Sequence, residues 1–355
     1  MPGPFPNLTL PLPLAISIVL AVIAVTIYAV RAHGRRARRR ERRRGAELTA
    51  AVRSFLVGEL TGDQLLRRTE QSGEGTFWTV LEAVSLRMSR ERWLRLSRAL
   101  VRSRHAGAER RALADDSPWR RALAARRLAL VRSRASWRVL RRAMVRGPEM
   151  VTYAAAMSLA RYRDRGALRW LLAHQEALAR RNRTALAALL RAFRQPGLPI
   201  LSQFLMRGGS QPRFELAMID ALGASGYRDA RPWLEQRLVK GDMEARAAAA
   251  RSLGAMRAVE CATSLMAALK DEAWQVRAQA ARALGRVRAP LATHVLAGRL
   301  TDPSWWVRHH AAYALAEMGE DGQAALRQTV AASPDPYARD MAREALEGGI
   351  KRLSA

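Results

Sequence analysis

The chain has 355 residues, a formal net charge of +30 and only 6% aromatic residues. That length leaves room for one large domain or two smaller ones. The single cysteine, Cys261, excludes an intrachain disulfide framework and permits a reducing compartment. Alanine, leucine and arginine dominate, whereas the β-branched and aromatic runs of strands are scarce, so we expect an all-α protein with almost no sheet.

The first predicted element is a transmembrane helix over residues 8–30, preceded by a short extracytoplasmic N-terminus over residues 1–7. Residues 8–30 carry no charge, and their number, 23, exceeds the roughly 20 residues that cross a bilayer core. A cleaved signal peptide would carry positive charge before the apolar stretch, but residues 1–7 have none. A buried helix of a soluble protein would not end in the block of charge that follows.

Residues 31–45 form an Arg-rich juxtamembrane segment with nine arginines and one glutamate. Such a block stays on the cytoplasmic side, so we expect a single-pass protein of the inner (cytoplasmic) membrane with its N-terminus outside and the rest of the chain in the cytoplasm. Either the block fixes this orientation and touches anionic lipid, or it docks an acidic partner or nucleic acid. Its position favours the first interpretation. The arginines expected at the membrane surface are Arg35, Arg36, Arg38, Arg39, Arg40, Arg42, Arg43 and Arg44.

Residues 46–117 are predicted to be a helical N-terminal cap made of degenerate repeats, since terminal repeats are usually atypical. Helices are expected over residues 47–60, from Thr61 to about residue 70, over 77–88 and over 91–103, the last one capped by Ser89. Charge is concentrated in residues 90–146, which hold 18 arginines and 4 acidic residues. This basic patch is interpreted as a solvated face near anionic lipid, as a docking face for an acidic protein loop, or as a nucleic-acid surface.

Residues 118–350 are predicted to form a solenoid of helical hairpins with a period of about 31 residues. Leucines recur 31 or 32 residues apart in eight units, at Leu128, Leu159, Leu190, Leu222, Leu253, Leu284, Leu315 and Leu346. Arginines recur with the same period at Arg246, Arg277, Arg308 and Arg339. Arg121 and Arg183 hold the equivalent position in earlier units, whereas Thr152 and Glu215 interrupt it.

Each unit carries the local signals of a helical hairpin. In the unit that starts at Asp271, this acidic residue can cap the first helix. The apolar stripe of that helix consists of Val276, Ala280, Ala281 and Leu284. Gly285, like Gly254 and Gly223, is expected to end its helix, and a second helix is expected over residues 290–300. Each hairpin leaves an apolar face open, so stacking on the next unit buries it.

Residues 271–285 read D-x-x-W-x-V-R-x-x-A-A-x-A-L-G, and residues 302–308 read D-P-x-W-W-V-R. This motif resembles the short bacterial HEAT repeat, of the kind also seen in phycocyanobilin lyase subunits. The resemblance implies an α-solenoid of HEAT-type repeats, and families with this fold are mostly protein-binding scaffolds.

The layout of membrane helix, Arg-rich segment, helical region and HEAT repeats also resembles a group of bacterial proteins often encoded beside membrane-bound family 2 glycosyltransferases. This resemblance, and not any spacing of residues, implies a glycosyltransferase partner and a connection to cell-envelope polysaccharide synthesis.

The repeated arginines have two interpretations. Each can bridge to an acidic residue of a neighbouring unit, such as Asp271 or Asp302, and set the stacking register; alternatively, the row lines a ligand surface. Tryptophans stand at the repeat starts, at Trp119, Trp274, Trp305 and Trp306. Most of them are expected to pack between units, but Trp305 and Trp306 are neighbours, so one faces outward and is a hot-spot candidate. The candidate partner-binding residues are Trp305, Trp306, Arg246, Arg277, Arg308 and Arg339.

No assembled catalytic motif occurs, and we expect no catalytic residue, metal or cofactor. G-x-x-x-x-G-K-[ST], G-x-S-x-G, H-E-x-x-H and C-x-x-C are all missing from the sequence. His309 and His310 are adjacent, so they point about 100° apart on a helix, and Cys261 is expected to be a small buried side chain.

The leading hypothesis is a non-catalytic, membrane-anchored cytoplasmic scaffold that binds or regulates a membrane-associated partner. A basic nucleic-acid-binding solenoid is the second hypothesis, which the membrane anchor disfavours. A lyase-type enzyme acting on a bound chromophore or cofactor is the third.

Overall fold

The computed structural model describes residues 39–353 together with Thr26 and Tyr28, with side chains described up to residue 348. The predicted transmembrane helix over residues 8–30, apart from Thr26 and Tyr28, lies outside the described residues, as do residues 1–7 and Arg35, Arg36 and Arg38. Within the described part, none of the helices is both long enough and apolar enough to span a bilayer.

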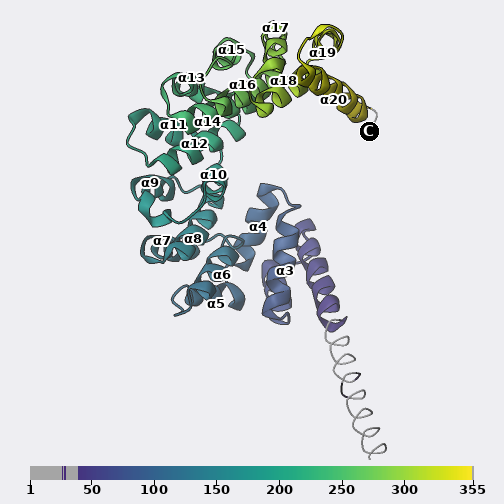
Figure 1. The fold of residues 1–355 in the computed structure, drawn as a ribbon. Coiled ribbons are helices and arrows are strands. Elements are labelled where there is room, and N and C mark those ends of the chain that lie inside the picture. The colour runs from purple at the N-terminus through teal and green to yellow at the C-terminus, as the bar shows by residue number, and fades with distance from the viewer. Residues whose placement is uncertain (1–25, 27, 29–38, 354–355) are drawn as a thin grey trace, which may run out of the picture. The chain divides into compact units, whose positions relative to one another are not determined.

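Every regular element in residues 39–353 is a helix, which confirms the all-α prediction for this part of the chain. The chain divides into two compact units (Figure 1). Of the described residues, unit 1 contains residues 39–115 and 130–136, and unit 2 contains residues 116–129 and 137–353.

In unit 1, a helix over residues 39–57 is followed by α2 (Gly62–Glu70), α3 (Glu74–Ser85), α4 (Arg90–Leu100) and α5 (Arg104–Ala112). The predicted caps are confirmed. Thr61 and Gln64 form a reciprocal capping box with distances of 2.8 and 3.3 Å, and Ser89 accepts from the Arg92 amide. Leu65, Phe77 and Leu96 are fully or almost fully buried in the apolar core of this unit.

Helix α5 is an element that the sequence did not predict. It contains Gly107 and several arginines and has little apolar periodicity. Its start is capped by Ser103, whose hydroxyl accepts from the Ala106 amide at 3.2 Å. The buried His105 ring stacks on Phe77 and contacts the Thr69 carbonyl oxygen at 3.2 Å. His105, stacked and hydrogen-bonded in the core, therefore anchors α5 where other helices use a stripe of aliphatic side chains.

Unit 2 consists of stacked helical hairpins. The first helices of the hairpins are α6 (Pro118–Leu128), α8 (Glu149–Arg161), α10 (Arg183–Ala192), α12 (Pro212–Ala224), α14 (Met243–Met256), α16 (Trp274–Val287), α18 (Trp305–Glu317) and α20 (Pro336–Leu353). The second helices are α7 (Arg134–Arg146, from residue 137 in this unit), α9 (Arg165–Ala173), α11 (Leu198–Arg207), α13 (Arg231–Lys240), α15 (Ala262–Ala268), α17 (Thr293–Ala297) and α19 (Glu320–Ala332). Short 3-10 helices join them, η1 (Gln175–Leu178), η2 (Arg228–Ala230), η3 (Val259–Cys261), η4 (Pro290–Ala292) and η5 (Gly298–Thr301).

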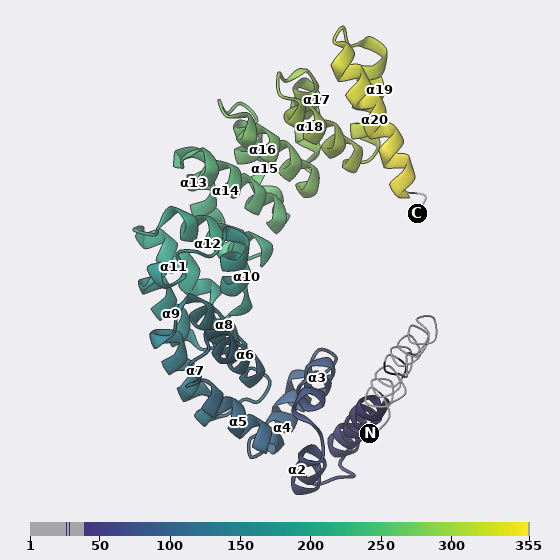
Figure 2. The same cartoon turned by 60° about the horizontal axis from the view of Figure 1, so that its bottom comes forward.

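The first helices form one layer and the second helices form another. Each first helix from α6 to α18 packs directly on the next first helix in the chain. Figure 1 and Figure 2 show α14, α16 and α18 side by side in one layer and α13, α15 and α17 in the layer next to it. The eight predicted units are thus present, each beginning near the expected residue. Seven of the eight periodic leucines, Leu128 to Leu315, are at most 1% exposed, and Leu346 is partly buried.

The periodic glycines do not end their helices, so that prediction is wrong. Gly254 and Gly285 lie inside the last turns of α14 and α16, which continue to left-handed residues at Arg257 and Arg288. A Cβ atom on Gly254 would lie 2.6 Å from Ala283, and one on Gly285 would lie 2.7 Å from the Ala314 Cα. Glycine is needed here because adjacent first helices touch backbone to backbone.

Candidate partner-binding surface

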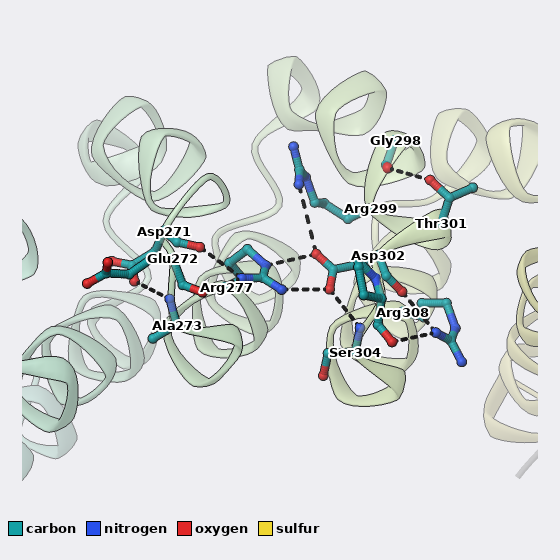
Figure 3. Close-up of polar contacts among 11 residues, drawn as sticks. Asp271, Glu272, Ala273, Arg277, Gly298, Arg299, Thr301, Asp302, Ser304 and Arg308 are labelled. Atoms are coloured by element: carbon teal, nitrogen blue, oxygen red, sulfur yellow. Dashed lines mark hydrogen bonds and ion pairs between the residues drawn. The ribbon is translucent and has the colours of Figure 1, made fainter.

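The repeated arginines of unit 2 form a ladder of ion pairs between consecutive hairpins. Arg246 donates from Nε and Nη2 to the two carboxylate oxygens of Asp271 at 2.8 and 2.9 Å. Arg277 binds Asp302 in the same way, with the same two distances (Figure 3). The stacking interpretation is confirmed for Arg246 and Arg277, because both guanidinium groups are bidentate partners of the next unit.

Each aspartate of this ladder has a second function at the start of a first helix. Asp302 Oδ1 accepts from the Ser304 amide at 3.0 Å, and Asp271 Oδ1 accepts from the Ala273 amide at 2.8 Å. Burial by itself would raise the pKa of Asp302, but hydrogen bonds from Arg277 and from the Ser304 amide outweigh it and lower the pKa. The same balance lowers the pKa of Asp271.

The ladder changes at Arg308. Its Nη1 donates to the carbonyl oxygens of Asp302 and Pro303 at 2.9 and 3.2 Å, as Arg277 does one unit earlier. The residue 31 positions after Asp302, however, is Ser333. Within the described residues no carboxylate pairs with Arg308, and its buried Nε has no hydrogen-bond partner. Arg339 closes the row with bonds to the Ser333 and Pro334 carbonyl oxygens.

The earlier interruptions of the ladder are compensated by other polar contacts. Glu215, at an arginine position, pairs with Arg237. Asp220 accepts from Arg183 at 2.5 and 2.9 Å and from Arg251 at 2.7 Å. These contacts were not predicted, because Arg237, Arg251 and Asp220 stand outside the predicted rows of repeated arginines and aspartates.

The tryptophans at the repeat starts are exposed, so the prediction that most of them pack between units is wrong. Trp119, Trp274, Trp305 and Trp306 are exposed by 66, 40, 46 and 51%. Trp274 and Trp306 still stack across neighbouring hairpins, with ring centroids 6.5 Å apart, and Trp305 meets Trp306 edge-on at 4.9 Å. Both Trp305 and Trp306 face solvent, where one was expected to. We call Trp274, Trp305, Trp306 and Tyr337 the aromatic edge, since all four stand at the starts of α16, α18 and α20.

Two histidines continue α18 behind the aromatic edge. His309 stacks on Trp305, with centroids 4.8 Å apart, and Tyr313 follows at 4.4 Å. Burial lowers the pKa of His309, and burial together with His309, Arg282 and Arg286 lowers the pKa of His310 to about 4. The described residues contain no group of three or more His, Cys, Asp or Glu side chains able to hold a metal ion.

Cys261 is buried, as expected, and burial raises the pKa of its thiol to about 12. Such a thiol is a poor nucleophile at neutral pH.

The described part of the basic segments lies on the surface. Arg39, Arg40, Arg42, Arg43 and Arg44 are exposed on the helix over residues 39–57, and Arg43 pairs with Glu47 at 2.9 Å. In the basic patch 90–146, helix α4 exposes four arginines, which are Arg90, Arg92, Arg95 and Arg98. Both surfaces can therefore attract anionic groups.

Comparison with known proteins gives the same class of fold. Residues 198–273 and 262–347 match the family described as HEAT repeats. No curated protein matches the chain. An engineered protein of known structure is 19% identical, with a TM-score of 0.39 over 86% of this chain and 98% of its own.

Two natural structures are also similar. The complex of CpcE and CpcF of phycocyanin lyase from Nostoc sp. PCC7120 is 19% identical, with a TM-score of 0.27 over 81% of this chain and 94% of its own. Importin beta is 16% identical, with a TM-score of 0.41 over 88% of this chain and 45% of its own. The described chain is thus an all-helical solenoid with HEAT repeats over residues 198–347, a class of fold that commonly binds protein partners.

Proposed function

We propose that the chain is a non-catalytic scaffold that binds a protein partner along the aromatic edge of its C-terminal hairpins. The observation that carries this proposal is the exposure of three tryptophans and Tyr337 at the starts of three consecutive first helices. Exposed aromatic side chains grouped in this way are typical of interface hot spots. Arg308 and Arg339 lie next to this edge, whereas Arg246 and Arg277 are already occupied by carboxylates and are left out of the surface.

The proposal extends to where the scaffold works. The uncharged stretch over residues 8–30 and the arginines after it support a cytoplasmic scaffold anchored in the inner membrane. The exposed arginines of residues 39–44 would then face anionic lipid. The resemblance of the layout supports a membrane-associated partner, and a family 2 glycosyltransferase of cell-envelope polysaccharide synthesis is the partner class that it implies.

Photo-crosslinking in cells tests the partner surface. Trp305 is replaced by p-benzoylphenylalanine in the full chain, and the same replacement at Leu291, which is 81% exposed in η4 between α16 and α17, serves as the control. We expect a discrete protein adduct from position 305 and none from position 291. Adducts to nucleic acid alone, or equal protein adducts from both positions, would contradict the proposal.

Fractionation tests the anchor. The full chain is expected in the membrane fraction after a high-salt wash, and the double substitution Val19→Arg with Ile23→Arg is expected to release it, because charge at the centre of a span is costly. Release of the unaltered chain by salt alone would show that electrostatic contact, and not a spanning helix, holds it at the membrane.

A further inference from the structure

The repeat itself shows what kind of group is missing beside Arg308. In the two preceding hairpins, one aspartate accepts from the backbone amide of the N-cap residue of the first helix and also binds the arginine of the hairpin before it. At the equivalent position, the Ser333 hydroxyl still accepts from the Asp335 amide at 3.3 Å, so it keeps the contact to the backbone at the start of the first helix. The hydroxyl is too short to reach the arginine as the aspartate carboxylate does, and no pair with Arg308 forms.

The rest of the arrangement around Arg308 is unchanged. Its Nη1 contacts to the Asp302 and Pro303 carbonyl oxygens match those of Arg277 to Asp271 and Glu272, so the guanidinium is held by the same backbone. What differs is the edge formed by Nε and Nη2, which binds the two carboxylate oxygens in the other pairs (Figure 3). Arg308 is therefore oriented toward a carboxylate that the next hairpin does not supply.

An exposed aromatic residue lies against the guanidinium group of Arg308. The Tyr337 ring lies over the Arg308 guanidinium, with Cζ 5.5 Å from the ring centroid, and Tyr337 is 68% exposed. Because the Tyr337 ring is this exposed, it can rotate into solvent without disturbing the core. Trp305 and Trp306 belong to the same short stretch of α18 and offer apolar surface next to the charge.

We propose that Arg308 is the docking site for an Asp or Glu side chain of a protein partner, with an aromatic or aliphatic residue of the same segment packed on Trp305, Trp306 or Tyr337. This inference rests on the proposed scaffold function and adds the chemistry of the bound segment. A protein carboxylate is favoured because Asp271 and Asp302 occupy the same edge of the equivalent arginines in this molecule. The chain's net charge of +30 also favours an acidic segment.

The substitution Ser333→Asp tests the site from within. An aspartate at position 333 is expected to form the missing pair, raise the midpoint of thermal unfolding and occupy the edge that a partner would use. The matched control is Ala331→Asp, which adds the same charge at an exposed position two residues away. If Ser333→Asp does not stabilise the chain relative to Ala331→Asp, the carboxylate geometry proposed for Arg308 is overturned.

Binding is tested with a phage-displayed random peptide library selected on the full chain in detergent. We expect the enriched peptides to carry Asp or Glu beside an apolar residue. As synthetic peptides, they should bind Ser333→Asp at least tenfold more weakly than the unaltered chain and bind Ala331→Asp within twofold of it. Replacing the peptide's acidic residue by its amide should cause a similar loss on the unaltered chain and no further loss on Ser333→Asp.

Peptides that bind the unaltered chain and Ser333→Asp equally would overturn the carboxylate assignment and leave the scaffold proposal standing. Enrichment of no peptide would count against both. Binding of anionic lipid vesicles that Ser333→Asp abolishes, without any peptide binding, would assign the site to lipid head groups and overturn the inference.

Discussion

The hairpins from α14 onward and those from α6 to α12 reach the same architecture in different ways. First helices from α12 to α20 start 31 residues apart, whereas the spacing earlier in the unit varies. The later hairpins repeat one polar contact, from arginine to the next aspartate, and the earlier ones use individual pairs such as Glu215 with Arg237. The buried leucines are common to both regions.

This difference separates the apolar contacts that build the solenoid from the polar contacts that set the register of its helices. Apolar stacking persists in both regions, so burial of the leucine row is the general source of stability. The Arg–Asp pairs hold particular helices in a particular register and can be replaced by other pairs. Where a pair is neither repeated nor replaced, as at Arg308, the arginine is available for another purpose.

The largest expected effect comes from making the same substitution at two neighbouring ladder positions. Arg277→Gln removes the bidentate partner of Asp302, whose side chain is only 1% exposed, and leaves it only the longer contact to Arg299 at 3.9 Å. We expect a loss of about 3–5 kcal/mol in the free energy of unfolding, measured by urea denaturation. Arg308→Gln removes no ion pair and should cost less than about 1 kcal/mol. Equal losses would show that the ladder at Arg308 is complete after all.

A smaller effect is expected from the close approach of first helices. Gly285→Ala places a Cβ atom 2.7 Å from the Ala314 Cα, so α16 and α18 have to move apart. We expect a loss of about 1–3 kcal/mol, reduced somewhat by the better helix propensity of alanine. Gly298→Ala is the control, because nothing lies within 4 Å of the added atom. A stabilised Gly285→Ala variant would mean that the helices adjust freely and that the glycine is not a packing requirement.

The sequence predicted the parts of the structure that repeat. The 31-residue leucine period located all eight first helices of unit 2, and the Asp–Arg spacing correctly suggested pairing between units, because a strict period fixes which residues stack. The interpretation of Gly254 and Gly285 was wrong, because glycine occurs both at helix ends and where two helices pack closely. The sequence alone does not distinguish these two uses. Helix α5 and the pair of Glu215 with Arg237 were missed because each depends on contacts outside the repeat.

The ladder carboxylates should also make the later hairpins sensitive to acid. The pKa of Asp302 is lowered below 3.8 in the folded chain, so its ion pair contributes stability above the unfolded pKa and loses it as pH falls through the folded value. Urea unfolding between pH 5 and pH 2 should therefore show a steeper loss for the unaltered chain than for Asp302→Asn. Glu320→Gln, at a side chain that is 88% exposed, should leave the slope unchanged. A slope unaffected by Asp302→Asn would contradict the assigned ion pair.

The smallest expected effect concerns His310, whose pKa falls to about 4 through burial and through His309, Arg282 and Arg286. A histidine with a lowered folded pKa favours the unfolded state as pH falls, because the unfolded chain takes up the proton first, near pH 6.5. The stability of the unaltered chain should therefore decline between pH 6.5 and pH 4, and His310→Gln should flatten this decline. His294→Gln, at an exposed position, is the control. If the thermal unfolding midpoint falls equally with pH in the unaltered chain and in both variants, groups other than His310 cause the decline. Protonation of His310 on α18 would then not distinguish the later hairpins from the earlier ones.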